Sequence, residues 1–466
     1  AEMLLTGVQR DLTATYGKWT RRYLWDRNYS ETRKPEVPSA IIETLSHQNF
    51  ADMRRALDPN FRFTLARSLY KTILRYVNGN HSLACVVQPL PVSNFRIVRT
   101  ADNQLQLSWL PVTDRLEPSA VPTTYNIYIA EGKNGFDNGR SVSGTSFTFT
   151  PKPNVVYQFR VTAVNRGGES FPSTTLAACV SAQAGARDVL VVDGFTRLAG
   201  PAVVDDGTRQ GFDLDTDMGV SLGVNAGFVG RQIDFDRTRV GSEGPGALGY
   251  CEDEFAGKFF MGKQQNESVC HVADIALSGA YNVVSSSVEA VENGFVKLEN
   301  YRVVDIMFGL QKYDGYSLVR YKTFSALLRK ALESYVRGNG RVFVSGAYVA
   351  SDMQLDAERS FMSNLFKVGF GGQNTDIATN LVNGLGISFD IIRRPNDRHY
   401  AAQSVDVVSP LAPAFCAMRY ADGTDAAVAY DGIDHKAFVM GFPVECINNV
   451  RSRQQVMKAV MTFLAK

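Results

Sequence analysis

The sequence of 466 residues lacks an apolar run of about 18 residues, the length that a membrane-spanning helix needs. Its charge is nearly balanced, with 49 basic against 47 acidic side chains, and no long block of one sign occurs. A nucleic-acid-binding surface normally shows as a basic stripe. The composition therefore argues against both a membrane span and a nucleic-acid partner.

The sequence also lacks the common metal and redox motifs. No CxxC pair occurs, which argues against a zinc ribbon or a thioredoxin motif. Four histidines stand singly, without HxH or HExxH spacing, so no complete zinc site is expected in this chain: His81, His271, His399 and His435. The even number of cysteines permits disulfides without requiring them. Cys85 and Cys179 bracket one apparent domain and are a candidate bridge.

The length predicts two to four domains. The chain begins at Ala1 without a methionine or a signal peptide, as a trimmed chain, a mature protein or a proteolytic fragment would. The missing signal does not argue against export.

Residues 1–82 are mostly helical in pattern, with one predicted strand. Leu4, Val8, Leu12 and Tyr16 recur at helical spacing. Residues 39–44 read as a strand that is apolar on both faces and ends in the carboxylate of Glu43, with helices following from about Phe50. One strand cannot form a covered sheet, so this region needs neighbouring strands from elsewhere.

The run PSAIIETLSHQNF and the helices after it resemble the last strand and closing helices of zinc-dependent N-acetylmuramoyl-L-alanine amidases. The resemblance implies that Glu43 is the catalytic acid/base, which activates zinc-bound water and protonates the leaving amine. The zinc ligands of that family lie upstream, so zinc would belong to the intact parent. The alternative for Glu43 is a strand-end carboxylate that accepts backbone hydrogen bonds. This chain reads ETLSHQN where many amidases read Glu-Gly-Phe-x-Ser-Asn, and His47 is a loop residue or faces the site.

From residue 88 the apolar period changes to two. Three runs each place alternate apolar residues on one face: LQLSW with Trp109, TYNIYIA with Tyr125, and VYQFRVTAVN with Tyr157. A tryptophan on an early strand and a tyrosine opening a late strand are features of β-sandwiches. Residues 88–182 resemble a fibronectin type III domain, a class of module that usually spaces or binds.

From residue 186 to 466 apolar strands alternate with amphipathic helices, which predicts a parallel α/β sheet with helices on both faces. The layout resembles flavodoxin-like and class I glutamine-amidotransferase-like domains, with a long insertion near 205–275. Tyr348 falls where those amidotransferases carry their cysteine nucleophile, so glutaminase chemistry is not expected. Ser345 is a weak alternative nucleophile because no G-x-S-x-G elbow surrounds it.

Ligands of open α/β sheets bind outside the carboxyl ends of the strands. The ligand crevice predicted there carries six polar or aromatic residues suited to a glycan: Asp193, Arg197, Gln311, Ser345, Tyr348 and Asp352. The alternative is that these groups cap helices and satisfy loops. Asp213, Asp215 and Asp217 resemble the start of an EF-hand loop, but Met218 and Val224 depart from it, leaving only a looser calcium site as an alternative.

The sequence therefore predicts a multidomain chain of α/β plus all-β class: a partial amidase-like α/β unit, a fibronectin type III β-sandwich and a flavodoxin-like parallel α/β domain. The expected function is that of the C-terminal portion of a peptidoglycan amidase whose accessory domains position the enzyme or bind glycan. The alternative is a non-catalytic glycan- or partner-binding scaffold of the cell envelope. Either role implies a periplasmic, cell-surface or secreted protein with peptidoglycan or another glycan as partner. No cofactor is evident in this chain itself.

Overall fold

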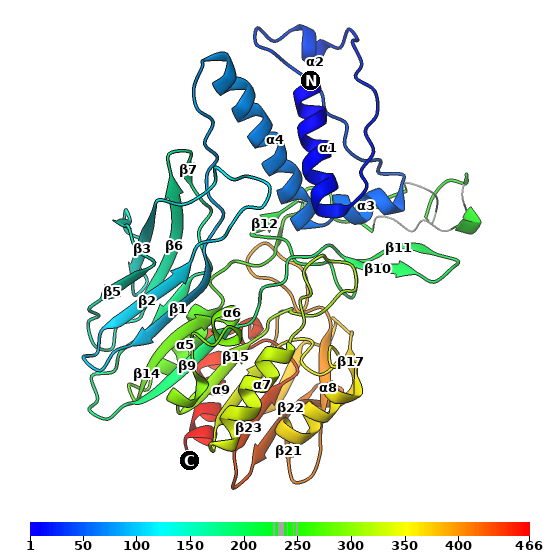
Figure 1. The fold of residues 1–466 in the computed structure, drawn as a ribbon. Helices are drawn as coiled ribbons and strands as arrows, with labels where there is room; N and C mark the ends of the chain where they lie inside the picture. Colours follow the sequence, from blue (N-terminus) through cyan, green and yellow to red (C-terminus); the bar gives the residue numbers. More distant parts are fainter. Residues whose placement is uncertain (227–228, 232–236, 240, 246, 248–249) are drawn as a thin grey trace.

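The computed structural model describes the whole chain except residues 227–228, 232–236, 240, 246 and 248–249. Three parts follow one another along the chain: helices at the N-terminus, a β-sandwich, and a large α/β part (Figure 1). All of the residues that the structure does not describe lie within the insertion expected near 205–275.

The N-terminal part is helical. Its helices are α1 (Glu2–Tyr16), α2 (Ser30–Arg33), α3 (Phe50–Ala56) and α4 (Pro59–Asn80). Val8 and Leu12 of α1 pack against Phe61 of α4, and the Lys71 ammonium pairs with the Asp11 carboxylate at 2.8 Å beneath them. Asn49 caps α3, while Asp58 caps α4 by accepting from the backbone N–H of Asn60.

The strand expected at residues 39–44 does not form. Residues 38–46 lie outside helices and strands, and the side chains of Ile41 and Ile42 are 48% and 36% exposed. No strand of the described residues lies beside this segment to complete a sheet. The expectation was wrong because an apolar run becomes a buried strand only where partner strands satisfy its backbone groups.

The middle part is a β-sandwich. One sheet holds β1 (Ser93–Arg99), β2 (Leu105–Leu110) and β5 (Ser146–Phe149). The other holds β3 (Thr124–Glu131), β4 (Arg140–Val142), β6 (Tyr157–Asn165), β7 (Gly168–Glu169) and β8 (Leu176–Ala178). Trp109 lies buried between the sheets with its ring centroid 5.5 Å from that of Tyr125. The period-two residues predicted to face inward are therefore in the core.

The C-terminal part is built on a parallel sheet. Its parallel strands lie in the spatial order β14-β9-β15-β16-β23, with bounds Tyr281–Ser287, Arg187–Asp193, Val303–Met307, Arg341–Ser345 and Lys436–Met440. In chain order this reads 2-1-3-4-5, the order of doubly wound sheets of the flavodoxin type. The class expected from the sequence, α/β plus all-β, is thus confirmed.

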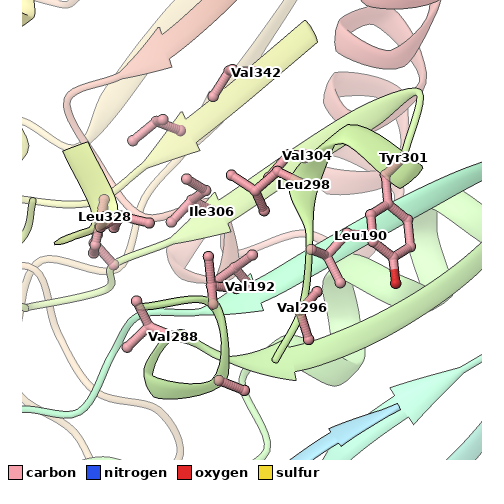
Figure 2. Packing of buried hydrophobic residues seen from close by; sticks show 14 of the residues in the cluster. Leu190, Val192, Val288, Val296, Leu298, Tyr301, Val304, Ile306, Leu328 and Val342 are labelled. Atoms are coloured by element: carbon pink, nitrogen blue, oxygen red, sulfur yellow. The ribbon is translucent and has the colours of Figure 1, made fainter. Parts of the chain in front are cut away.

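Helices cover both faces of this sheet. One face packs on α6 (Val288–Glu292), α7 (Ala326–Arg337), α8 (Asp356–Phe361) and the π-turn Met362–Phe366. The other face packs on α5 (Ser268–Ala276) and α9 (Val450–Ala465). Leu190 and Val192 of β9 point to the first face, with Val304 and Ile306 of β15 beside them (Figure 2). Val189 and Val191 point to the second face, so the strand is apolar throughout.

The parallel sheet continues into antiparallel strands, so it is mixed rather than parallel throughout. Beyond β23 lie β22 (Asp425–Asp431), β21 (Phe415–Tyr420), β18 (Leu381–Gly384) and β19 (Ile387–Asp390). Short pairs stand apart from it: β10 (Ala202–Asp205) with β11 (Gln210–Asp213), β12 (Val224–Asn225) with β13 (Phe260–Met261), and β17 (Val368–Asn374) with β20 (Val405–Pro410). The 3₁₀ turns are Arg237–Arg239, Leu298–Asn300 and Val444–Cys446. The segment 199–220, which includes the β10–β11 hairpin, reaches toward α3 (Figure 1).

The sandwich is joined to the α/β sheet by hydrogen bonds. Cys179 and Val283 exchange two backbone bonds of 2.8 Å. The Ser285 hydroxyl accepts from the Ala177 N–H and donates to the Ala177 carbonyl at 2.8 and 2.7 Å. Arg96 of β1 pairs antiparallel with Ser286 of β14. Hydrogen bonds therefore run directly from the sandwich to the α/β sheet, in which β1 and β14 are neighbouring strands.

No helix of the described residues combines the length and apolarity that crossing a bilayer demands.

Candidate functional site

Glu43 lies on the surface in the irregular segment between α2 and α3. His47 is exposed in the same segment. Among the described residues no group of three or more histidine, cysteine, aspartate or glutamate side chains is placed to hold a metal ion. The residues of this chain therefore do not fit a zinc ion at Glu43, and no step of a hydrolytic reaction follows from its surroundings.

The six residues of the predicted crevice lie close to the carboxyl ends of β9, β15 and β16, and all are buried. None has a side chain more than 4% exposed. Asp193 accepts from the Thr174 hydroxyl at 2.8 Å and from the Phe195 N–H. Gln311 accepts from two consecutive N–H groups, those of Thr196 and Arg197. These groups satisfy loops, as the alternative interpretation proposed, and the edge above them is covered.

Segment 199–220 covers this edge and brings in Asp217, which forms the centre of a buried ion cluster. The Arg197 guanidinium and the Lys312 ammonium both lie 2.7 Å from Oδ2 of Asp217. Burial alone would raise the pKa of Asp217, but the two cations outweigh it and hold that pKa well below its usual value. Lys312 also lies 4.4 Å from the centre of the Tyr348 ring. The cluster holds segment 199–220 onto the sheet.

Asp352 and Ser345 are the remaining two residues of the predicted crevice. The Asp352 carboxylate accepts from the N–H groups of Tyr313 and Thr323 at 3.1 and 2.8 Å, which orders the loop after β15. The Ser345 hydroxyl is buried without a hydrogen-bond partner among the described residues. No histidine of the described residues hydrogen-bonds to Ser345, so none of them serves it as an activating base.

The other acidic candidates serve separate roles. Asp213 closes its own turn by accepting from the N–H groups of Asp215 and Thr216. Asp215 pairs with Arg231 at 3.0 Å, whereas Asp217 pairs with Arg197 in the interior. The three carboxylates do not converge, and the looser calcium site is not formed.

A buried network that the sequence analysis did not identify lies beneath α5. Nδ1 of His271 is 2.7 Å from Oδ2 of Asp305 on β15, and Nε2 is 3.3 Å from Oε2 of Glu445. The Tyr400 hydroxyl donates to the other oxygen of Glu445 at 2.6 Å. Burial would lower the pKa of His271, but Asp305 and Glu445 outweigh it and raise that pKa well above its usual value.

A signal for this network was present in the sequence. Asp305 interrupts the otherwise apolar strand VVDIM, and Glu445 stands within the apolar run FPVEC. A buried carboxylate needs a partner, so two such carboxylates in core segments predict a buried cation or donor. Identifying His271 as that partner needs the three-dimensional fold, because it lies 34 and 174 positions away.

A second buried carboxylate lies at Asp406 on β20. Its Oδ2 accepts from the N–H groups of Ala350 and Ser351 at 2.7 and 2.9 Å, while Oδ1 has no partner among the described residues. Burial raises the pKa of Asp406 to about 6, against the lowering effect of those hydrogen bonds.

Two cavities lie where the N-terminal helices meet the α/β part. The smaller, of about 60 Å³, is lined by Pro59, Arg62, Met218, Tyr400 and Gln403 and has room for a few water molecules. The larger, of about 210 Å³, is lined on one side by α3 and the turn before α4 and on the other by segment 200–212 and the loop after β15. We call it the interdomain pocket and define it by Arg54, Arg55, Asp58, Phe212, Asp314 and Tyr316.

The interdomain pocket combines charged groups with aromatic and apolar surface. The Arg54 guanidinium lies 4.3 Å from the centre of the Tyr316 ring. Phe212 packs on Phe50 with ring centroids 5.4 Å apart and supplies an apolar wall. Sequence reasoning missed this pocket because its residues come from segments about 150 and 260 positions apart that are joined only by the fold.

Comparison with known proteins identifies one part of the chain. Residues 90–178 match the fibronectin type III domain family, so the sandwich is a fibronectin type III domain. No curated protein matches the chain.

Solved structures that match include the fourth FNIII domain of a human protein, at 23% identity over 22% of this chain and 87% of that chain, with a TM-score of 0.20. The twitchin kinase region of C. elegans matches at 26% identity over 20% of this chain and 17% of that chain, with a TM-score of 0.18. The FN5 domain of Drosophila Lar matches at 20% identity over 20% of this chain and 96% of that chain, with a TM-score of 0.16.

Proposed function

We propose that this chain is a non-catalytic scaffold of the cell envelope that binds a glycan in the interdomain pocket. The observation that carries the proposal is a concave site in which arginine side chains, an aromatic ring and an apolar wall converge from two parts of the fold. Binding sites commonly lie where domains meet and combine apolar walls with a few polar groups that fix orientation. A sugar ring, with apolar C–H faces and polar edges, suits such a lining.

The state of the other candidate groups also supports binding over catalysis. The crevice residues are buried and most of them take part in internal hydrogen bonds or ion pairs, and the described residues form no metal-binding group around Glu43. The fibronectin type III domain supports the proposal as a class of module that spaces or binds. An envelope location, periplasmic, cell-surface or secreted, is part of the same proposal.

The test is co-sedimentation of the full chain with insoluble peptidoglycan and with insoluble cell-wall polysaccharide, each compared with cellulose. Wild-type protein is expected in the pellet of at least one envelope glycan. Tyr316→Ala is expected to lower the bound fraction several-fold. The matched control is Tyr313→Ala, since Tyr313 lies on the same loop, is partly exposed and does not line the pocket. Equal recovery of wild type and both variants in the supernatant with every envelope glycan would overturn the proposal.

A second candidate is that this chain is the C-terminal portion of a peptidoglycan amidase. The observation that favours it is the apolar surface of the N-terminal part, where Ile41, Ile42 and Ile73 are exposed as they would be if further protein covered them. A longer polypeptide that contains this chain would then release stem peptides from peptidoglycan in the presence of zinc, and Glu43→Gln would abolish release. Unchanged release by the Glu43→Gln variant would exclude Glu43 as the acid/base.

A further inference from the structure

Arg54 and Arg55 are adjacent arginines that line the interdomain pocket and form no ion pair with a carboxylate of the described residues. Four neighbouring arginines form ion pairs with a carboxylate: Arg10, Arg21, Arg67 and Arg75. No carboxylate of the described residues lies within ion-pair distance of Arg54 or Arg55, although both are half-buried against the pocket. Asp58 acts on Arg55 electrostatically from beyond ion-pair distance, so both half-buried guanidinium groups keep charge that a ligand carboxylate can pair with directly.

Aromatic rings hold both guanidinium groups in place. Arg54 lies 4.3 Å from the centre of the Tyr316 ring, and Arg55 lies 4.8 Å from the centre of the Tyr16 ring. A guanidinium whose face rests on a ring keeps its N–H donors at the edge, where they can form paired hydrogen bonds to a carboxylate. The arginines are therefore pre-organised, and no carboxylate in the part of the chain that the structure describes uses their donors.

The acidic residues of the pocket are already engaged. Asp314 accepts from the N–H groups of Tyr316 and Ser317 and from the Ser317 hydroxyl. Asp58 accepts from the Asn60 backbone and side chain as the cap of α4. These two carboxylates shape the turns that form the pocket, and their negative charge makes a doubly charged phosphate less suited to it than a singly charged carboxylate.

The shape of the pocket fits a ring that bears such a group. Its volume of about 210 Å³ is that of a small organic ring with its substituents, and Val203 and Phe212 line it with apolar atoms. The apolar face of a pyranose can lie on these atoms while a carboxylate on the ring reaches the arginines at the rim.

Resting on the proposed glycan-binding function, we infer that the interdomain pocket selects a sugar that carries a carboxylate, with Arg54 and Arg55 as the groups that bind the carboxylate. The protein thus discriminates acidic from neutral glycans through charge that the N-terminal part contributes and a wall that the α/β part contributes. Binding joins the two parts, because neither forms the pocket alone.

The test is calorimetric titration of the full chain with two uronate probes, tetragalacturonate and a glucuronate-containing hyaluronate tetrasaccharide, and with the methyl ester of each. The ester keeps the ring and removes the charge. At least one uronate is expected to bind, with its ester at least about tenfold weaker, which corresponds to about 1.4 kcal/mol. Arg54→Gln and Arg55→Gln are each expected to weaken the uronate about tenfold and leave the ester unchanged.

The matched control is Arg33→Gln, which removes one positive charge from α2 outside the pocket and is expected to bind as wild type does. Thermal unfolding of each variant separates loss of binding from loss of fold. Equal binding of uronate and ester would overturn acidic selectivity while leaving the glycan-binding function in place. Failure of both uronates while insoluble glycan still retains the protein would overturn this inference alone. Displacement of the uronate by inorganic phosphate at equal concentration would show a general anion site and would also overturn it.

Discussion

Nδ1 of His271 and Oδ2 of Asp305 are 2.7 Å apart, and both side chains are completely buried between α5 and the parallel sheet. Glu445 contacts the opposite ring nitrogen, so the imidazole, whose pKa is raised well above its usual value, lies between two carboxyl groups. Such a cluster is stable only while all of its members are present, because a buried charge without a partner is costly.

The first prediction is that His271→Gln lowers the free energy of unfolding by about 3–5 kcal/mol, because it leaves two carboxylates in the core without a cation. Asp305→Asn is expected to cost less, since His271 still pairs with Glu445. The measurement is urea unfolding followed by tryptophan fluorescence. Lys152→Gln is the control: its pair with Glu131 is on the surface, so little or no loss of stability is expected.

The pH dependence of the same variant follows from the raised pKa of His271. A group whose pKa is higher in the folded protein stabilises it fully below the unfolded value of about 6.5 and loses that effect as the pH rises through the folded value. The difference between wild type and His271→Gln is therefore expected to be largest near pH 6 and to shrink as the pH rises above about 6.5. A difference that grows with pH would show that His271 is neutral in the fold.

The second prediction concerns Asp406, whose pKa rises from 3.8 to about 6 on burial. Because the pKa is raised, the protonated Asp406 carboxyl group stabilises the fold below about pH 4. This stabilisation is lost as the pH rises through 6, so the charged carboxylate destabilises the fold at neutral pH. Asp406→Asn keeps an oxygen that accepts from Ala350 and Ser351. We expect the variant to match wild type near pH 4 and to exceed it by up to about 3 kcal/mol above pH 7. A difference that is the same at both pH values would contradict the raised pKa.

The third prediction tests how the sandwich is joined to the α/β part. Ser285→Ala removes only the hydroxyl and leaves the N–H and carbonyl of Ala177 without that partner, so a loss of about 2 kcal/mol is expected. Calorimetry is expected to show one transition for wild type and a separate, earlier transition of the sandwich for the variant. Ser334→Ala, which removes an exposed hydroxyl on α7, should leave the transition unchanged.

Individual strands and helices could be predicted because the spacing of apolar residues along a segment indicates which of its side chains face inward. The inward residues of the sandwich strands followed from period two, and Trp109, Tyr125 and Tyr157 are buried as expected. Helical spacing also gives the inner face of α9, where Val456 and Leu464 are buried. Helical spacing would also place Leu327 on the inner face of α7, yet its side chain is exposed, since spacing alone does not give the width of a buried stripe.

The site could be predicted only in part, because it depends on which segment covers which edge. The rule for parallel sheets brought Arg197, Gln311 and Tyr348 to the same edge, and the structure places them there. It gave no information on segment 199–220, which covers them with Asp217. The prediction of a strand at residues 39–44 was wrong for a related reason. A buried strand needs partner strands, and the sequence of the segment alone cannot specify them.

The fourth prediction is that all six cysteines are thiols and react in an order set by exposure. The structure leaves each of them unpaired, including Cys85 and Cys179. Burial raises the pKa of Cys179 to about 11 and raises that of Cys446 well above its usual value, so their reactive thiolate is scarce, whereas Cys251 is exposed. Protein prepared without reductant should titrate six thiols in denaturant with a thiol reagent, and mass mapping of native protein should find Cys251 labelled first and Cys446 last. Four thiols, with Cys85 and Cys179 recovered as one linked peptide, would instead establish the disulfide that their spacing suggests.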